Sequence, residues 1–178
     1  MKLQWKSRLH RMVVAGVFAA LLAVLSQISI PLPTGIPVTL QTFAVALCGF
    51  ALGPGLGAAA VGVYLALGAV GIPVFAGFSG GIGSFVGMTG GYLWAFLPMA
   101  FLCGLGARQK NRALALTVGF LGLVVCHLCG SFQFALVSAV SPWNAFLLAS
   151  APYLLKDAAS LVAAYLAAAK LGLPLPQA

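Results

Sequence analysis

The side chains most able to do chemistry in this sequence are those of Lys156 and Asp157, which are adjacent in a long apolar run. Asp157 is the single acidic residue among 178. A charged group inside an apolar span costs roughly 2.5–3.5 kcal/mol on membrane-insertion scales, so it indicates a functional role. Neighbouring residues on a helix project about 100° apart, so we expect two residues that border one cavity separately, not a salt bridge. Lys156 would then face an anionic group and Asp157 would accept N–H donors. The alternative is a structural pair, or a lysine that extends outward from a span starting near Pro152.

A few other polar side chains lie in apolar segments. Gln41 begins the second such segment, and its amide is able to bind a polar group of a ligand. An interhelical hydrogen bond, worth about 1 kcal/mol in a membrane, is an equally good interpretation. Gln133, Ser131 and His127 in the fifth segment pose the same question, and for His127 we favour a structural role.

The composition excludes a water-soluble domain. The chain is 62% hydrophobic and 6% charged, whereas soluble domains contain roughly 25% charged residues. No Asp, Glu, Lys or Arg occurs between Arg11 and Arg108, and the apolar runs do not alternate as the strands of a β-barrel do. We therefore expect an all-α integral membrane protein, a single domain over 1–178, in contact with membrane lipid. The net charge of +8 is concentrated beside apolar runs, which follows the positive-inside rule and does not indicate binding of nucleic acid.

Six apolar segments predict six transmembrane helices. The first continues without a clean cleavage site, so we expect a retained span and not a signal peptide. The second and third are shorter than the roughly 20 residues of a straight span, so they are either short tilted spans or a re-entrant hairpin. An even number of segments separates the basic clusters, which places both termini on the cytoplasmic side. The expected spans are 13–30, 38–52, 55–70, 90–107, 113–138 and 153–170.

This topology places the segments 31–37, 71–89 and 139–152 on the outer side. The first contains three prolines, so we expect irregular backbone there. Residues 71–91 contain eight glycines, too few polar residues for a solvated linker and no regular helical pattern. A long apolar loop of this kind is typical of a lid or a binding loop. Ligand entry from outside is the expected consequence.

The motifs of several other function classes are absent from the sequence. Without a GxxxxGK[ST] loop, nucleotide hydrolysis is not expected in this chain. Without HExxH, GxSxG or paired acids, we expect no enzyme activity and no catalytic residues. The sequence Cys126-His127-Leu128-Cys129 lacks a second cluster to complete a tetrahedral site, so no metal or cofactor is expected.

Small residues recur along the first segment. Ala15, Ala19 and Ala23 are spaced by four, with Gly16 and Ala20 alongside. Such a face allows another helix to approach closely, within the chain or in another subunit.

Four stretches in order along the chain form a recognisable set. They are Pro37-Val38-Thr39-Leu40-Gln41-Thr42, Leu67-Gly68-Ala69-Val70-Gly71-Ile72-Pro73-Val74-Phe75-Ala76, Thr89-Gly90-Gly91-Tyr92-Leu93 and Pro152-Tyr153-Leu154-Leu155-Lys156-Asp157. This set resembles the BioY family, the biotin-specific S components of energy-coupling-factor (ECF) vitamin transporters. The resemblance covers about 12–170, and GIPVFAG and TGGYL are its strongest elements.

The resemblance implies an ECF S-component-like bundle of six helices in the bacterial cytoplasmic membrane. It implies biotin as the ligand, bound in a cavity that is covered by the loops after the first and third helices. The expected partners are a transmembrane coupling subunit, which docks on Ala15 and Ala19, and two ATPase subunits. The expected substrate-binding residues are Asp157, Lys156, Gln41, Phe75, Gly80, Gly81, Gly90, Gly91, Tyr92 and Tyr153.

Two positions depart from the family pattern. Met88 stands where the family often has proline, and Ser160 stands where many members carry a lysine one turn after the aspartate. The assignment of Asp157 therefore transfers directly, whereas Lys156 would have to act from a different face of the helix. Alternatives are an S component for another vitamin, a membrane scaffold without a ligand, and an autonomous facilitator.

Overall fold

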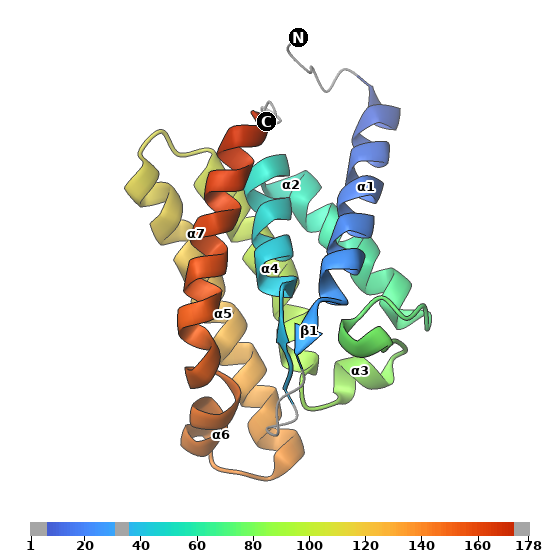
Figure 1. Cartoon of the computed structure of the whole chain (residues 1–178), viewed down its shortest axis with the longest axis vertical. Helices are drawn as coiled ribbons and strands as arrows, with labels where there is room; N and C mark the ends of the chain where they lie inside the picture. The colour runs from blue at the N-terminus through green and yellow to red at the C-terminus, as the bar shows by residue number, and fades with distance from the viewer. Residues whose placement is uncertain (1–6, 31–35, 173–178) are drawn as a thin grey trace.

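The apolar segments form helices that pack side by side in a bundle (Figure 1). The computed structural model describes residues 7–30 and 36–172. Within them, five helical stretches are long and apolar enough to cross a membrane by length and composition. They are α1 (Arg8–Ser26), α2 (Gln41–Ala69), α4 (Gly90–Ala107), α5 (Arg112–Ser138) and the stretch Pro142–Leu171, which contains α6 (Pro142–Ala149) and α7 (Leu154–Leu171).

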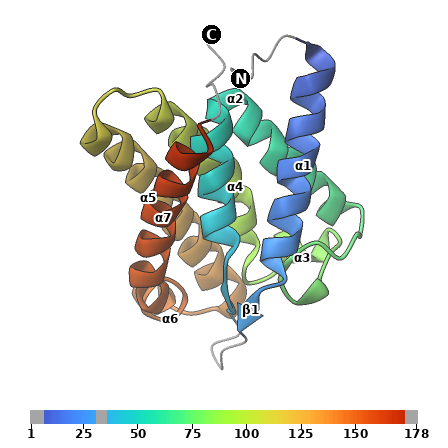
Figure 2. The same ribbon diagram turned by 45° about the horizontal axis from the view of Figure 1, so that its top comes forward.

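The expected segments 38–52 and 55–70 are joined in α2, which turns sharply at Gly53. Gly53 has φ 79° and is followed by Pro54; a positive φ suits glycine because it has no Cβ. Figures 1 and 2 show both halves of α2 descending from this turn at an angle to each other, so that the chain reverses direction there. The halves are about 18 and 24 Å long at 1.5 Å per residue, against a hydrocarbon thickness of about 30 Å. They are therefore short segments, and other parts of the chain surround them.

The core of the bundle lies around α2. In the most apolar window of α2, 78% of the residues are buried, against 22% in that of α1. Fully buried side chains around this core include Leu22, Leu52, Tyr64, Met99 and Leu161. α1 is thus a peripheral helix that packs along α2 by one face.

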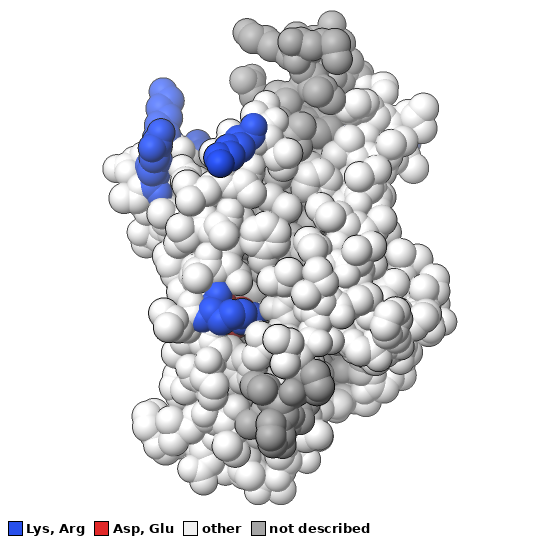
Figure 3. Space-filling model, in the orientation of Figure 1, with Lys and Arg blue, Asp and Glu red and all other residues white. Residues whose placement is uncertain are grey.

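Basic side chains mark one end of the bundle. The start of α1, the connection from α4 to α5 and the end of α7 lie together at the upper end in Figures 1 and 2. Lys and Arg gather at this end in Figure 3, apart from one basic patch at mid-height beside the acidic residue. The described basic residues on these elements are Arg8, Arg11, Arg108, Lys110, Arg112 and Lys170. This clustering fits the charge pattern on which the expected topology was based.

The segments 71–89 and 139–152, which were expected on the outer side, lie at the opposite end (Figure 1). An antiparallel pair, β1 (Ser29–Ile30) and β2 (Val38–Thr39), flanks the expected irregular segment 31–37, most of which lies outside the described residues. The segment 71–89 contains two short helical pieces, η1 (Ala76–Phe78) and α3 (Gly83–Val86).

The segment 139–152 was expected to be a loop, but it contains α6 followed by η2 (Ala151–Tyr153). Ser141 caps α6 by accepting a hydrogen bond from the Asn144 N–H, and Pro142 occupies the first helical position, which proline favours. The short capped helix was overlooked because its residues are as apolar as those of the spans.

Candidate functional site

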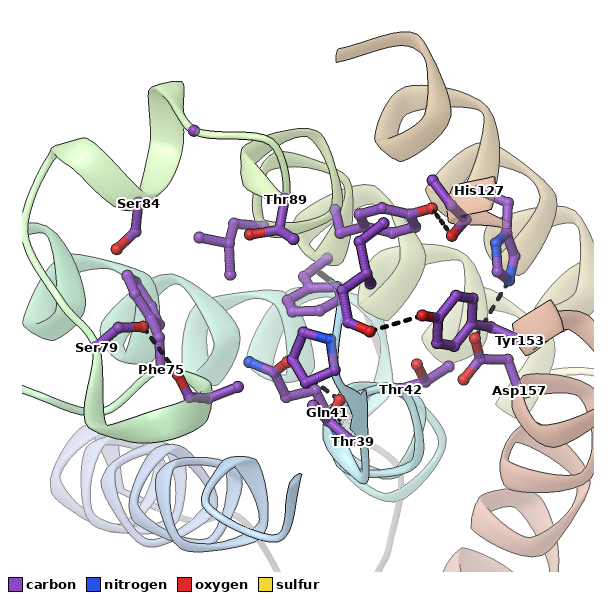
Figure 4. Close-up of a pocket in the computed structure, with 18 of the residues that line it drawn as sticks. Thr39, Gln41, Thr42, Phe75, Ser79, Ser84, Thr89, His127, Tyr153 and Asp157 are labelled. Carbon is purple, nitrogen blue, oxygen red and sulfur yellow. Dashed lines mark hydrogen bonds and ion pairs between the residues drawn. The ribbon is translucent and has the colours of Figure 1, made fainter. Parts of the chain in front are cut away.

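A cavity of about 290 Å³ lies under the loop end of the bundle, near the lower limit for ligand pockets. Its wall is built from β2, α2, the segment 71–89, α4, α5 and the stretch from α6 to α7. Figure 4 shows Phe75, Ser79 and Ser84 at one side of it and His127, Tyr153 and Asp157 at the other. The cavity therefore joins the glycine-rich segment to the helices that carry the ionisable residues.

Lys156 and Asp157 form an ion pair on the cavity wall. Lys156 Nζ contacts Asp157 Oδ1 and also donates a hydrogen bond of 2.9 Å to the carbonyl oxygen of Thr39. The expectation of separate neighbours was therefore wrong: the long, flexible lysine stem spans the angle between adjacent residues in the first turn of α7. Both residues nevertheless line the cavity, and the side chain of Asp157 is 7% exposed. The pairing offsets the cost of burying the carboxylate.

His127 lies against the same carboxylate. Its Nε2 is 3.3 Å from Asp157 Oδ2, and the residue is 4% exposed and lines the cavity. This contact between helices agrees with the structural role that the sequence favoured, and the histidine lines the cavity as well. An ionisable group in an apolar span, the signal that singled out Asp157, was equally present at His127.

Gln41 lines the cavity and is also part of a hydrogen-bond chain between helices. Its Nε2 donates to Tyr64 Oη over 2.8 Å, and its Oε1 accepts from Thr39 Oγ1 over 3.2 Å. Tyr64 Oη is 2.9 Å from Ser26 Oγ, which donates to the Leu22 carbonyl oxygen. Because the Ser26 hydrogen is used in that bond, Tyr64 donates to Ser26. The expected interhelical hydrogen bond is therefore present, and Gln41 also lines the cavity, while its contact with a ligand stays a prediction.

Phe75, Tyr92 and Tyr153 line the cavity as expected. Phe75 is 2% exposed and makes edge contacts with Tyr64 and Phe85 at ring-centre distances of 5.3 and 5.6 Å. The two tyrosine hydroxyls are engaged with backbone. Tyr92 donates to the Ala149 carbonyl oxygen (2.5 Å) and Tyr153 to that of Ile36 (2.6 Å). Their rings are therefore held in place as walls.

Several hydroxyl side chains of the wall were not predicted from the sequence. Thr42 lies near Asp157 in Figure 4, whereas Ser79, Ser84 and Thr89 lie toward the glycine-rich segment. Hydroxyls are common in loops, and only the fold brings these four to one cavity.

The four glycines expected in the site are not among the residues that line the cavity. A Cβ on Gly90 would lie 1.9 Å from the Phe85 carbonyl oxygen, and one on Gly91 would lie 2.2 Å from that of Cys129. These two glycines therefore permit close packing of α4 against α3 and α5.

Gly80 and Gly81 shape the glycine-rich segment itself. A Cβ on Gly80 would lie 2.5 Å from the Ile72 carbonyl oxygen. Gly81 has φ 88°, and its N–H donates to the Gly68 carbonyl oxygen at the end of α2. These positions lie between the family stretches 67–76 and 89–93, and both glycines determine the backbone geometry of the segment.

Two glutamines fasten the segment 71–89 over the cavity. Gln27, which follows α1, donates from Nε2 to the Val74 carbonyl oxygen (3.0 Å) and accepts at Oε1 from the Phe78 N–H (3.0 Å). Gln133 on α5 donates from Nε2 to the carbonyl oxygens of Phe85 (2.7 Å) and Gly87 (2.8 Å). Backbone groups that the glycine-rich sequence leaves unpaired are satisfied in this way.

Ala15 and Ala19 lie on the inner face of α1, with 7% and 1% exposure. The expectation that these two residues form an external docking face is therefore wrong. Gly16 and Ala20, one position further along, are exposed, and no atom of the described residues lies within 4 Å of a Cβ built on Gly16. Sequence spacing alone does not identify which of two adjacent small-residue stripes faces outward.

Residues 1–176 of the chain match the model of the BioY family. A probable biotin transporter BioY from Pyrococcus horikoshii is 42% identical over 88% of this chain and 92% of that protein. A biotin transporter BioY from Thermotoga maritima is 45% identical over 70% of this chain and 73% of its own length.

A solved structure is also similar to the bundle. It is a crystal structure of the S-component for biotin from an ECF-type ABC transporter, with a TM-score of 0.86 and 24% identity over 96% of this chain and 94% of that chain. The likeness confirms the S-component-like fold. The family match extends over nearly the whole sequence, and the Pyrococcus protein is similar over almost its entire length; the chain belongs to the BioY family.

Proposed function

We propose that this chain is the biotin-binding S component of an ATP-driven ECF-type importer. The observation that carries the proposal is the cavity under the segment 71–89, with Asp157 held between Lys156 and His127 at one side. Family membership supports the choice of biotin, because the relatives are named as biotin transporters.

The chemistry of the wall matches the parts of biotin. Asp157 accepts hydrogen bonds, so it suits the N–H groups of the ureido ring and would repel the carboxylate tail. The tail then lies toward Ser79 and Ser84, whose hydroxyls are donors. Phe75 and Tyr92 offer apolar surface to the sulfur-containing ring between these ends.

We propose that the basic end of the bundle faces the cytoplasm and the cavity end faces outward. The basic residues of α1, the connection between α4 and α5, and α7 share that end, as the positive-inside rule requires. Both termini then lie inside, in the cytoplasmic membrane of a bacterium. Biotin enters from the side of the segment 71–89.

Energy for import would come from other subunits. The sequence has no phosphate-binding loop, so a membrane coupling subunit and two ATPase subunits would supply it. The exposed small residues Gly16 and Ala20 on α1 suit close approach of a helix of the coupling subunit.

Thermal unfolding of the purified protein tests the ligand. We expect the unfolding temperature to rise with biotin concentration, since a ligand of the native state stabilises it by mass action. Biotin amide and other vitamins serve as comparisons. Stabilisation by a different vitamin, or none by biotin, would refute the proposal; biotin uptake by liposomes that contain this chain alone would instead indicate a facilitator.

A further inference from the structure

His127 is held at the cavity wall by contacts on several sides. It lies within α5, and its ring meets that of Tyr92 edge to face at a centre distance of 6.0 Å and an angle of 88°. Its backbone carbonyl oxygen accepts hydrogen bonds from Ser131 Oγ (2.5 Å) and Ser150 Oγ (3.3 Å). Tyr92 Oη is itself within 2.9 Å of Ser150 Oγ. These contacts fix the position of the imidazole before any ligand arrives.

The imidazole is one of three side chains at the Asp157 carboxylate, together with Lys156 and Thr42. His127 Nε2 lies 3.3 Å from Oδ2, whereas Lys156 contacts Oδ1 and extends to the Thr39 carbonyl oxygen. Figure 4 shows the histidine reaching the carboxylate from the neighbouring helix. The two oxygens of Asp157 are therefore approached from α5 and from α7 itself.

The nitrogens of His127 make no well-aligned hydrogen bond within residues 7–30 and 36–172. A buried polar atom without a partner is costly, so such atoms are usually retained for a purpose. Nε2 is close to Asp157 without ideal alignment, and Nδ1 has no partner in this part of the chain. This arrangement is expected if the contact between His127 Nε2 and Asp157 Oδ2 becomes a well-aligned hydrogen bond only when a ligand occupies the cavity.

We propose that His127 is a positioning residue for ligand recognition and acts through Asp157. Donation from Nε2–H to Oδ2 orients the carboxylate, so that its remaining lone pairs face the N–H groups of the ligand. This role rests on the proposed binding of biotin. Lys156 on α7 contacts Oδ1 and Thr42 binds the carboxylate from α2, so His127 is the group that fixes it from α5. Through this third contact, His127 determines selectivity for a ligand with paired N–H donors.

Three substitutions distinguish this role from simple packing. In His127→Gln, the amide nitrogen takes approximately the place of Nε2, whereas in His127→Asn it takes that of Nδ1. His127→Leu fills the space without a donor. Biotin affinity is measured by titration calorimetry, together with thermal unfolding without ligand. Leu128→Ala, on the exposed side of α5, is the matched control.

We expect His127→Gln to retain most of the affinity, and His127→Asn and His127→Leu to lose about tenfold to a hundredfold, as for a hydrogen bond to a charged group. In an Asp157→Asn background, His127→Leu should cause no further loss, because residues that act through one another are not additive. Biotin carrying a methyl group on one ureido nitrogen should be rejected less strongly by His127→Asn than by the native protein.

Equal losses in His127→Gln and His127→Asn would overturn the proposal, as would full additivity with Asp157→Asn. If His127→Leu does not fold, the comparison of Gln with Asn still decides the question. Failure of the native protein to bind biotin would refute the proposed function itself, and this outcome differs from every result above.

Discussion

Gln27 and Gln133 hold the same segment from two different helices. Gln27, at the end of α1, binds the backbone at Val74 and Phe78, and Gln133 on α5 binds it at Phe85 and Gly87. The segment 71–89, which forms the cover of the cavity, is thus held near both of its ends by amide side chains. The sequence 71–89 has few polar side chains of its own for this purpose.

Replacing either glutamine with leucine should loosen the cover. Each amide makes at least two hydrogen bonds, each worth about 0.5–1.5 kcal/mol net. We expect faster amide hydrogen exchange within 71–89 and weaker biotin binding in Gln27→Leu and Gln133→Leu. Gln109→Leu, at the basic end, is the control and should change neither. Unaltered exchange in both variants would show that the segment is held by its packing.

Removing Lys156 should destabilise the protein more than removing the whole pair. Lys156→Met leaves a buried carboxylate without its cation, which costs about 3–5 kcal/mol in comparable cases. Lys156→Met/Asp157→Asn removes that charge, so we expect it to recover most of the thermal stability without biotin. It should not recover biotin binding. If the single variant is as stable as the native protein, the pair contributes little to folding.

Gly90 and Gly91 should matter for folding and not for ligand contact. An added methyl group at either position meets a backbone oxygen, and overpacking of this kind costs about 1–3 kcal/mol. We expect Gly90→Ala and Gly91→Ala to lower the unfolding temperature in the absence of biotin. Gly83→Ala is the control, because the new Cβ has no atom within 4 Å among residues 7–30 and 36–172. If either variant binds biotin more weakly but unfolds at the same temperature as the native protein, the glycine contributes to the binding site after all.

Substitutions on the buried and on the exposed small residues of α1 should have different effects, the first on stability and the second on assembly with a partner subunit. Ala19→Leu inserts a large side chain into the bundle and should destabilise the isolated chain by about 1–3 kcal/mol. Gly16→Leu and Ala20→Leu should leave stability and biotin binding unchanged, but reduce copurification with a coupling subunit. Unimpaired copurification of both variants would exclude this face as the docking surface.

Much of the fold was predictable because the membrane limits the choices. The span 90–107 coincides with α4, and 113–138 and 153–170 differ from α5 and α7 by one residue at the ends. The boundary between the expected segments 38–52 and 55–70 coincides with the turn at Gly53 and Pro54, residue types that favour turns. That the two flanking segments remain short depends on their burial by other helices, which the sequence does not reveal.

The site was predictable in its residues more than in its contacts. Asp157 and Gln41 were predicted as polar groups in apolar segments, and Phe75 as part of a family motif. All three line the cavity. The pairing of Lys156 with Asp157 was missed because an argument from Cβ directions ignores the length of the lysine stem. His127 carried the same signal as Asp157, an ionisable group in an apolar span, but its contact with Asp157 depends on which face of α5 meets α7, and an apolar sequence does not provide that.

The attachment of Gln27 to the cavity cover has a thermodynamic consequence. α1 is the least buried of the long helices, and its end is bonded to the segment above the cavity. A displacement of α1 from α2 must stretch or break these bonds, so the helix and the cover cannot move independently. By linkage, any partner that favours the displaced helix lowers the affinity for a trapped ligand, and the ligand lowers the affinity for that partner by the same factor.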